Sequence, residues 1–369
     1  MLPTSWRMVA VLYLWTVSMA ACSEPLPARP LAMHEAYVWQ HHWGPAMRAA
    51  VEQRPRAIQQ LRVLALTWTQ QDAPPVPTSV DLIGLAHAGP VTVVARIEGS
   101  RLVAGLSLRP LVDLALAWRE QGIDVRGLEV DHDCATARVA AYAGWLRAQR
   151  PLVGSLPLAI TALPDWHRSP HLPALVEAAD RVTVQLHAIR APSLFDAKAA
   201  RLDCEAWAEA TRRPFWIALP TYQVRLRDGP QVSADPQVVA AFVESLRQNP
   251  VPGLEGAAWF RLGHAGDEDA WPGATLAAVM TGLPLRGEVN VELRAAGTGL
   301  WDIVAHNTGN VGAALPTKLA FGGQVEWLEG VRGCAVRHRE LHCPPTLVAQ
   351  PKVPLVLGYV RGSEVRHVP

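Results

Sequence analysis

Three acidic residues stand at alternate positions in the middle of the chain: Glu129, Asp131 and Asp133. The run 125–133 that contains them is short and carries apolar residues between the acids, which predicts a β-strand. Because strand side chains alternate, the three carboxylates should share one face. Carboxylates gathered in a low-dielectric site cannot all ionise without partners, so at least one pKa should rise. A raised carboxyl pKa beside an ionised neighbour is what the general acid of glycoside hydrolysis needs.

The same acids have an alternative role in a structural network with arginines. Arg96 and Arg261 fall near the ends of two other predicted strands and could pair with the acids there. Burying several charges for structure alone is inefficient, because desolvation offsets much of the attraction between them. We therefore favour a functional site, with Asp133 as general acid, Asp131 as its electrostatic partner and Glu129 hydrogen-bonded behind them.

The elements that must position these acids form a regular series. Short apolar runs predict eight strands, at residues 36–43, 62–69, 91–99, 125–133, 156–164, 181–189, 214–222 and 256–263. Helix-compatible runs lie between most of them, at residues 108–121, 135–149, 173–180, 204–212 and 235–247. Strands alternating with helices predict a parallel sheet, and eight such units fit a (β/α)₈ TIM-type barrel. An open doubly wound sheet is the alternative, but no Gly-rich phosphate loop follows the first strand.

Active sites of such barrels lie at the carboxyl-terminal ends of the strands, and polar or aromatic residues gather at these predicted ends. No single one of them identifies a site, but their collection at the same end of the barrel does. We therefore treat as candidate substrate contacts Trp43, His42, Arg96, Thr161, Trp166, Gln185, His187, Tyr222, Trp259 and Arg261.

The pattern changes after about residue 285. Runs at 289–295, 300–307, 316–321, 331–337 and 353–360 read as strands separated by Gly, Asn and Pro turns, with no convincing helix. We expect a small β-sandwich there, and residues 302–312 resemble pieces of bacterial immunoglobulin-like modules. The predicted division is a barrel over 34–285 and a β-sandwich domain over 286–369.

The amino-terminal segment reads as a targeting signal rather than as structure. Arg7 precedes an apolar run at 8–19 that is short for a membrane span. The sequence Met19-Ala20-Ala21-Cys22 resembles the bacterial lipobox, in which the cysteine is lipidated. We expect a lipoprotein signal peptide over 1–21, a tether over 22–33, and an exported protein anchored to the membrane at Cys22. A signal peptide cleaved by the ordinary peptidase is the alternative.

Four other cysteines follow. Cys334 and Cys343 are close in sequence within a predicted β region and are the best disulfide candidates, since export permits disulfides. Cys134 and Cys204 are either a second pair or small buried side chains. No zinc-type Cys/His spacing is present, and we expect neither a metal nor a cofactor.

Composition narrows the partners. The formal net charge is +1 and there is no run of Lys or Arg, which argues against nucleic acid. Tryptophan is frequent, at 14 residues. These rings either pack in the core or offer flat apolar platforms for sugars. The expected partner is therefore a glycan or polysaccharide.

The run 126–133 resembles the fourth-strand signature of family 18 chitinase-like glycoside hydrolases, commonly D-G-I-D-I-D-W-E. Gly127 matches its glycine, Asp131 matches the Asp that supports the substrate's acetamido group, and Asp133 stands at the position of the catalytic Glu. Arg126 and Glu129 replace the first two Asp residues, and Asp133 is one methylene shorter than Glu. The resemblance implies a barrel that acts on or binds an N-acylated sugar.

A second resemblance covers most of the predicted barrel. The segments 38–43 (VWQHHW), 129–134 (EVDHDC), 158–166 (LAITALPDW) and 184–187 (VQLH) together are similar to a bacterial family described as domain of unknown function 3142 (DUF3142). This resemblance implies an exported, barrel-like protein and no particular reaction.

Three functions follow from these features. The first is a carbohydrate-active hydrolase that uses the paired carboxylates. The second is a glycan-binding or envelope scaffold protein on a hydrolase barrel that has lost catalysis, as the altered motif and the appended β domain would fit. The third is a metal-dependent hydrolase using Asp131 and Asp133 with His41, His42 or His187, although no tight ligand motif supports it.

Overall fold

The structure is a computed structural model that describes residues 26–69, 72–102, 105–189, 193–227 and 229–368. The predicted signal peptide and the lipidation candidate Cys22 lie outside the described residues. In the part of the chain that is described, no helix is long and apolar enough to cross a membrane.

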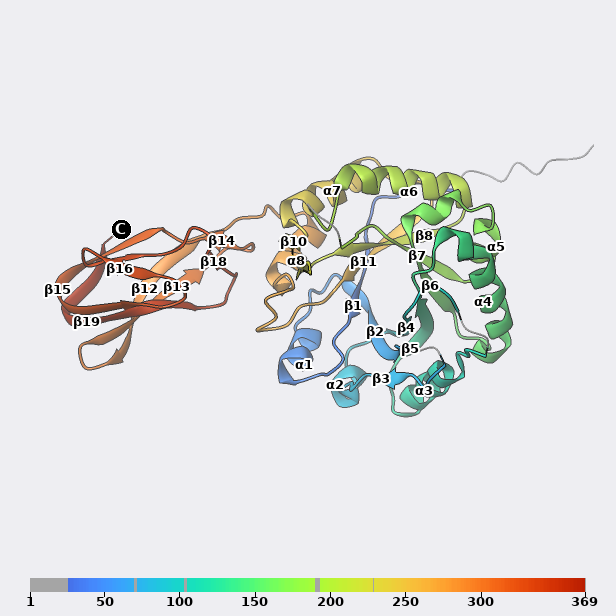
Figure 1. Cartoon of the computed structure of the whole chain (residues 1–369), viewed down its shortest axis with the longest axis horizontal. Helices are drawn as coiled ribbons and strands as arrows, with labels where there is room; N and C mark the ends of the chain where they lie inside the picture. The colour runs from blue at the N-terminus through green and yellow to red at the C-terminus, as the bar shows by residue number, and fades with distance from the viewer. Residues whose placement is uncertain (1–25, 70–71, 103–104, 190–192, 228, 369) are drawn as a thin grey trace, which may run out of the picture.

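Eight parallel strands among the described residues close into a barrel (Figure 1). The strands run in the order β1, β2, β4, β5, β6, β7, β8 and β11, and β1 pairs with both β2 and β11. This closure confirms the barrel and excludes the open doubly wound sheet. The strands are β1 (Met33–Val38), β2 (Ile58–Trp68), β4 (Val91–Ile97), β5 (Val125–Asp131), β6 (Leu158–Ala162), β7 (Arg181–Gln185), β8 (Phe215–Pro220) and β11 (Leu254–Phe260).

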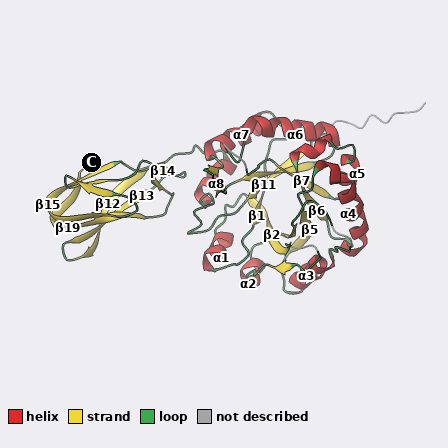
Figure 2. Cartoon of the chain, in the orientation of Figure 1, coloured by secondary structure: helices red, strands yellow, loops and turns green. Residues whose placement is uncertain are grey.

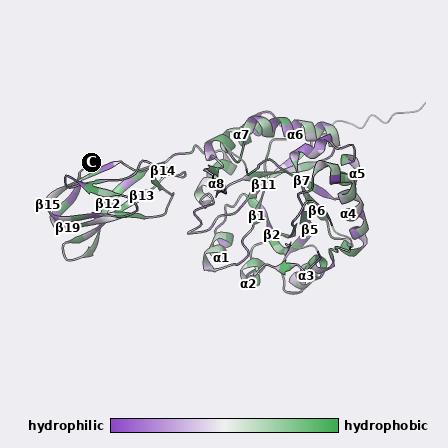
Figure 3. Cartoon of the chain, in the orientation of Figure 1, coloured by the Kyte–Doolittle hydropathy of each residue, from purple (hydrophilic) through white to green (hydrophobic). Residues whose placement is uncertain are grey.

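Helices cover the outside of the barrel as a ring (Figure 2). Hydrophobic and hydrophilic residues alternate along these helices (Figure 3), as in amphipathic helices that pack on a sheet. Asp196 and Asp235 cap two of them by accepting hydrogen bonds from backbone N–H groups of the first turn. The helices are α1 (Pro45–Glu52), α2 (Leu82–Ala86), α3 (Arg109–Glu120), α4 (Val139–Val153), α5 (Leu172–Glu177), α6 (Ala197–Thr211), α7 (Pro236–Gln248) and α8 (Gly273–Thr281).

Side-chain alternation divides each barrel strand between two environments. In β5, Leu128 and Val130 pack in the apolar core between strands and helices. Glu129 and Asp131 point to the other side, the barrel interior, where they bond to side chains of other strands. The large apolar core therefore lies outside the strands, and the barrel interior is unusually polar.

The named strands of the carboxyl-terminal part all pair antiparallel. One sheet has the order β12-β13-β19-β15-β17-β16, and a two-stranded ribbon pairs β14 with β18. Side chains from both, including Ile303, Leu319, Leu357 and Ala349, form one apolar core. The elements are β12 (Val289–Gly297), β13 (Leu300–Asn307), β14 (Ala313–Ala314), β15 (Lys318–Gly330), β16 (Ala335–Arg337), β17 (Glu340–His342), β18 (Val348–Ala349) and β19 (Leu355–Val368).

The cysteines of this part are joined. Cys334 and Cys343 form a disulfide with a Cα–Cα distance of 4.1 Å, and both lie in the β core. Cys134 and Cys204, in contrast, are free and buried in the barrel half of the molecule. Cys134 and Cys204 therefore act as small buried side chains and do not form a second disulfide.

A turn of the β domain is fastened to the barrel. The Thr275 hydroxyl of α8 donates a hydrogen bond to the Asn310 carbonyl at 2.7 Å, and the Asn310 amide donates to the Pro284 carbonyl at 3.0 Å. Gly309 approaches so closely that a Cβ there would lie 2.1 Å from the Arg286 carbonyl oxygen. A side chain at this position would push the turn away from the connecting segment.

The predicted tether over 22–33 differs from the structure where it is described. Ala28 forms a β-bridge with Pro252, and Leu31 is buried in the barrel core. This stretch therefore lies against the barrel, because its leucine finds apolar surface there. The domain boundaries at 34–285 and 286–369 stay predictions; α8 ends at Thr281 and β12 begins at Val289.

Candidate functional site

The barrel interior holds an arginine that no sequence pattern had singled out. Arg62, on β2, is 0 % exposed. Its Nε donates to Glu35 Oε2 at 2.6 Å, and its Nη1 donates to Glu129 Oε2 at 2.7 Å and to Thr183 Oγ1 at 2.6 Å. Tyr37 completes the group by donating its hydroxyl proton to Glu129 Oε1 at 2.7 Å. We call Glu35, Tyr37, Arg62, Glu129 and Thr183 the interior network.

Charge balance explains how this network tolerates burial. Burial by itself would lower the pKa of the Arg62 guanidinium, but Glu129, Tyr37 and Glu35 more than offset it and raise that pKa. Burial would likewise raise the pKa of Glu35, but the nearby guanidinium groups of Arg62 and Arg181 lower it overall. The charged forms are therefore held by one another.

The interior network gives Glu129 a place away from the solvent. The carboxylate is fully buried and its two oxygens bond to Tyr37 and Arg62. The expected position, behind Asp131 and Asp133 on the same strand face, agrees with this placement. A direct contact between Glu129 and a ligand does not agree with this placement, because the interior network surrounds the Glu129 carboxylate.

Above this network, Asp131 is nearly buried and fully hydrogen-bonded. Its Oδ2 accepts from Arg96 Nη1 at 2.7 Å, and its Oδ1 accepts from Thr161 Oγ1 at 2.6 Å. The amide of Gln185 adds a longer bond to the same Oδ1, at 3.2 Å. Three strands, β4, β6 and β7, therefore converge on one carboxylate of β5.

Asp133 follows β5 and lies further out. Its side chain is 36 % exposed, and its Oδ2 pairs with Arg96 Nη2 at 2.9 Å. Gln185 Nε2 also reaches Asp133 Oδ1, at 3.3 Å. Arg96 and Gln185 thus each hold both aspartates, and Arg96 keeps 28 % of its side chain exposed. We call Arg96, Asp131, Asp133, Thr161 and Gln185 the mouth cluster.

The mouth cluster perturbs the titration of its inner acid. Burial raises the pKa of Asp131 to about 6, with a further rise from Asp133, while Arg96 and Thr161 act in the opposite direction. For Arg96 itself, burial lowers the pKa, but Asp131 and Asp133 outweigh burial and raise it. Asp131 therefore titrates near neutral pH, as the alternation of acids in the sequence had led us to expect of one of the three.

Aromatic rings line the opposite side of the barrel mouth. Trp39, just after β1, meets Phe260 of β11 edge-on with centroids 4.9 Å apart. Phe260 also contacts His187 at 5.6 Å and Tyr222 at 5.6 Å. Burial lowers the pKa of His187 to about 4 and raises that of Tyr222 to about 12. Both are therefore neutral at neutral pH, and this half of the mouth carries apolar surface without charge.

Two tryptophans that we proposed as sugar platforms do not lie at the barrel mouth. Trp166 and Trp259 are 0 % exposed in the core between strands and helices. The Trp166 indole donates to the Cys134 carbonyl at 3.0 Å, and that of Trp259 to His34 Nδ1 at 3.3 Å. Trp259 points away from the barrel interior because it alternates with the inward Ala258 and Phe260, and Trp166 packs in the outer core from the segment after β6. The prediction that they stack on a ligand is wrong.

Three other predicted contacts stand apart from the mouth cluster. Arg261 pairs with Asp267, at 2.5 Å, rather than with the acids of β5. Trp43 is half-buried against the core, and His42 is exposed in the loop after β1. Among the described residues, no group of three or more His, Cys, Asp or Glu side chains is placed to hold a metal ion.

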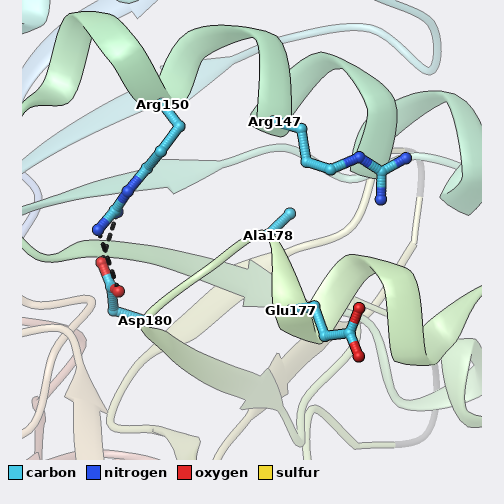
Figure 4. Close-up of a pocket in the computed structure, with 5 residues that line it drawn as sticks. All are labelled: Arg147, Arg150, Glu177, Ala178 and Asp180. Carbon is cyan, nitrogen blue, oxygen red and sulfur yellow. Dashed lines mark hydrogen bonds and ion pairs between the residues drawn. The ribbon is translucent and has the colours of Figure 1, made fainter.

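A hollow of about 370 Å³ lies on the outside of the barrel (Figure 4). Its charges are used locally: Arg150 and Asp180 form a bidentate pair at 2.5 and 3.2 Å. Asp180 also accepts the Leu158 backbone N–H at 2.7 Å, at the start of β6. This hollow is at the amino-terminal end of the strands, and its contacts serve the fold.

Alternation along the strands contained a signal for the residues that were missed. In β1, Ala36 and Val38 face the helices, so Tyr37 and Trp39 had to face inward. In β11, the same rule places Phe260 inward and Trp259 outward. The same rule places Arg62 inward, between Leu61 and Val63, but it does not identify the partners of Arg62, which come from β1, β5 and β7.

The comparisons with known proteins agree with this barrel. Residues 87–265, from just before β4 to just after β11, match the model of domain of unknown function 3142 (DUF3142). The match confirms the resemblance noted in segments 129–134, 158–166 and 184–187, whereas segment 38–43 lies outside it. A search of the curated proteins finds no match.

Solved structures with the same architecture include two from bacteria. A class V chitinase from Pseudomonas fluorescens Pf-5 aligns with 11 % identity over 68 % of this chain and 99 % of its own, with a TM-score of 0.51. The spore cortex-lytic enzyme SleL from Bacillus cereus aligns with 10 % identity over 70 % of this chain and 75 % of its own, with a TM-score of 0.50. The chain therefore carries a DUF3142-matching segment within a barrel of the chitinase-like glycoside hydrolase fold.

Proposed function

We propose that the barrel mouth binds a glycan and that Asp133 is the acidic residue that contacts it. The observation that carries the proposal is the arrangement of the mouth cluster. An exposed carboxylate, a guanidinium and an amide are held together at the carboxyl-terminal ends of β4, β5 and β7. That end of the strands is where barrels of this kind place their sites.

The two halves of the mouth suit the chemistry of a sugar. A pyranose ring offers hydroxyl groups around its edge and C–H groups on its faces. Arg96, Asp133 and Gln185 supply donors and acceptors for hydroxyl groups. Trp39 and Phe260 supply apolar surface on the other side. The named activities of the chitinase and of SleL, which share the fold, point to the same class of ligand.

Hydrolysis of the bound glycan is the second candidate. The raised pKa of Asp131, about 6, favours it, because a proton is then available beside Asp133 near neutral pH. A general acid must donate a proton to the leaving oxygen, whereas Asp133 accepts a hydrogen bond from Arg96 at 2.9 Å. Catalysis would therefore require the ligand to displace Arg96 from Asp133. The resting geometry favours binding.

Oligosaccharide binding by the Asp133→Asn variant tests the proposal. We expect isothermal titration with oligomers of N-acetylglucosamine and of glucose to show binding by the wild-type protein. The affinity should fall about tenfold or more in the variant, because a charge-assisted hydrogen bond is lost. Asp113→Asn, on the exposed surface of α3, is the matched control. Equal affinity of the two variants would refute the role of Asp133.

The same mixtures separate the two candidates. Chromatography after long incubation shows whether the oligosaccharides are shortened. Shortening by the wild-type protein that disappears in Asp133→Asn supports hydrolysis, and binding without shortening supports recognition alone.

We also propose that the protein is exported and held at the cell envelope by a lipid on Cys22. The apolar run 8–19 and the sequence Met19-Ala20-Ala21-Cys22 support this location. Labelled palmitate should enter the protein in cells, and Cys22→Ser should abolish the labelling. Labelling of the variant at the wild-type level would contradict the anchor.

A further inference from the structure

The β domain has a hollow of its own, which is separate from the barrel mouth and from the hollow of Figure 4. It measures about 660 Å³, within the usual range of ligand sites, and is lined by Gly297, Thr298, Leu300, Glu326, Trp327 and Arg361. Leu300, Arg361 and Trp327 are directly paired across β13, β19 and β15. Directly paired residues point to the same face of a sheet.

That face is turned to solvent. The neighbouring row Trp301, Val360 and Leu328 belongs to the opposite face and packs in the β core. Trp327 keeps 46 % of its surface exposed. In the barrel, by contrast, Trp166 and Trp259 are fully buried. The fold of the β domain therefore does not require an indole at position 327.

A second ring stands close to Trp327 on the same face. Tyr359 lies two residues before Arg361 on β19 and pairs with Glu329, two residues after Trp327. Trp327 and Tyr359 are therefore diagonal neighbours, roughly 7–8 Å apart at their backbones. The two rings therefore share one face of the sheet, and both are at least partly exposed.

Polar groups stand beside the exposed ring. The register of β15 shifts between Val325 and Trp327, so Glu326 is the extra residue of a bulge, a feature that redirects side chains. Arg361 Nε and Glu326 Oε2 are 4.0 Å apart, and both side chains are mostly exposed. So loose a pair leaves N–H donors and carboxylate oxygens free for a ligand. Because the two charges cancel, the hollow suits a neutral polyhydroxyl ligand better than an ion.

The hollow lies far from the barrel. At one end of the β12–β13 hairpin, Val289 pairs with Asn307 next to the segment fastened to α8. At its other end, Gly297 pairs with Leu300 in the hollow. A ligand bound there is thus separated from the barrel mouth by the length of the domain.

We propose that this hollow is a second glycan-binding site, which holds a neutral sugar ring of a polysaccharide. The Trp327 indole lies against the C–H face of the ring, and Arg361 and Glu326 hydrogen-bond its hydroxyl groups. The inference rests on the proposed function in taking the ligand to be a glycan. Its role is to retain the protein on an extended chain, while the barrel mouth engages a separate stretch.

The experiment compares retention on solid polysaccharide with binding of short soluble oligomers. Full-length protein is mixed with washed chitin, cellulose or protein-free peptidoglycan, and the unbound fraction gives an apparent Kd. We expect Trp327→Ala to raise that Kd roughly tenfold, as the loss of an aromatic stacking contact would. Trp327→Phe should retain much of the affinity. Val353→Ala, at another exposed apolar side chain of the β domain, should match the wild type.

Soluble oligosaccharides distinguish this inference from the proposed function. Trp327→Ala should bind them at the barrel mouth as the wild type does, which also shows that the variant is folded. If Trp327→Ala is retained on every solid polysaccharide as strongly as the wild type, the second site is overturned. The proposal of a glycan site at the barrel mouth is not affected by that result. Peptidoglycan that still carries its protein is included as a further solid. If Trp327→Ala loses retention on that material alone, the second glycan site is overturned in favour of a protein partner.

Discussion

Two arginine–carboxylate groups lie in the same barrel, one around Glu129 and the other around Asp131, two residues further along β5, and they differ in their exposure to solvent. In the interior network, Arg62 is 0 % exposed and is held by Glu35 and Glu129 together with Tyr37 and Thr183. In the mouth cluster, Arg96 is 28 % exposed and holds Asp131 and Asp133, of which Asp133 is open to solvent. The residue types are nearly the same in both.

The difference teaches that composition does not separate a structural charge network from a candidate site. A pair that the protein encloses completely is out of a ligand's reach, and removing one member leaves an uncompensated charge. A pair at the rim can exchange a protein partner for a ligand at small cost. Glu129 belongs to the first kind and Asp133 to the second, although they lie only four residues apart, Glu129 in β5 and Asp133 just after it.

The largest expected effect is on stability, from Arg62→Met. The variant leaves Glu35 and Glu129 buried without their shared partner, so the free energy of unfolding should fall by about 3–5 kcal/mol. Arg96→Met is the matched control. Asp131 is as buried as Glu35, but Asp133 and Arg96 itself are partly exposed, so we expect a smaller loss of about 1–2 kcal/mol. Urea unfolding followed by tryptophan fluorescence measures both.

Equal losses in the two arginine variants would break the comparison. They would mean that the mouth cluster is as closed in solution as the interior network. In that case Asp133 would not be available to a ligand, and the proposed site would lose its main support.

The next effect concerns pH and separates Asp131 from the interior acids. Its pKa rises from 3.8 to about 6 on folding, so between these values the folded state holds a proton that the unfolded state does not. Stability should therefore fall as the pH rises from 4 to 6, by on the order of 2–3 kcal/mol. Asp131→Asn should remove this fall, so the variant should gain on the wild type between pH 4 and pH 7.

The test is to measure the free energy of unfolding of the wild type and of Asp131→Asn at pH 4 and at pH 7. Burial and Arg247 lower the pKa of His34 to about 4, which works in the opposite direction because a neutral buried histidine loses stability in acid. This contribution is common to both proteins and cancels in their difference. A difference that stays constant from pH 4 to pH 7 would show that Asp131 titrates normally.

The smallest effect comes from the threonine in each group. Thr183→Val removes one acceptor from Arg62, which keeps its carboxylate partners, so the cost should be about 1 kcal/mol and independent of pH. Thr161→Val removes a donor that lowers the pKa of Asp131. It should move the pH-dependent fall in stability to higher pH. Identical pH profiles for the two variants would argue that the two groups do not differ in titration.

Sequence reasoning recovered the frame of this site better than its contacts. The eight strands and the barrel were predictable because each strand is a local apolar run between turn residues or helices. Alternation also placed Glu129, Asp131 and Asp133 on the inward face. The same rule, applied to β1 and β11, would have selected Trp39 and Phe260 in place of Trp259.

What the sequence alone determined was therefore where the strands lie along the chain and the face on which each side chain lies, because both follow from backbone periodicity within a few residues. Tertiary structure decided which carboxylate is enclosed and which is open. Arg62 reaches Glu129 from 67 residues away and Arg96 reaches Asp131 from 35, and only closure of the barrel brings them together. The depth of each acid along the barrel axis then sets its exposure, and no local pattern encodes that depth.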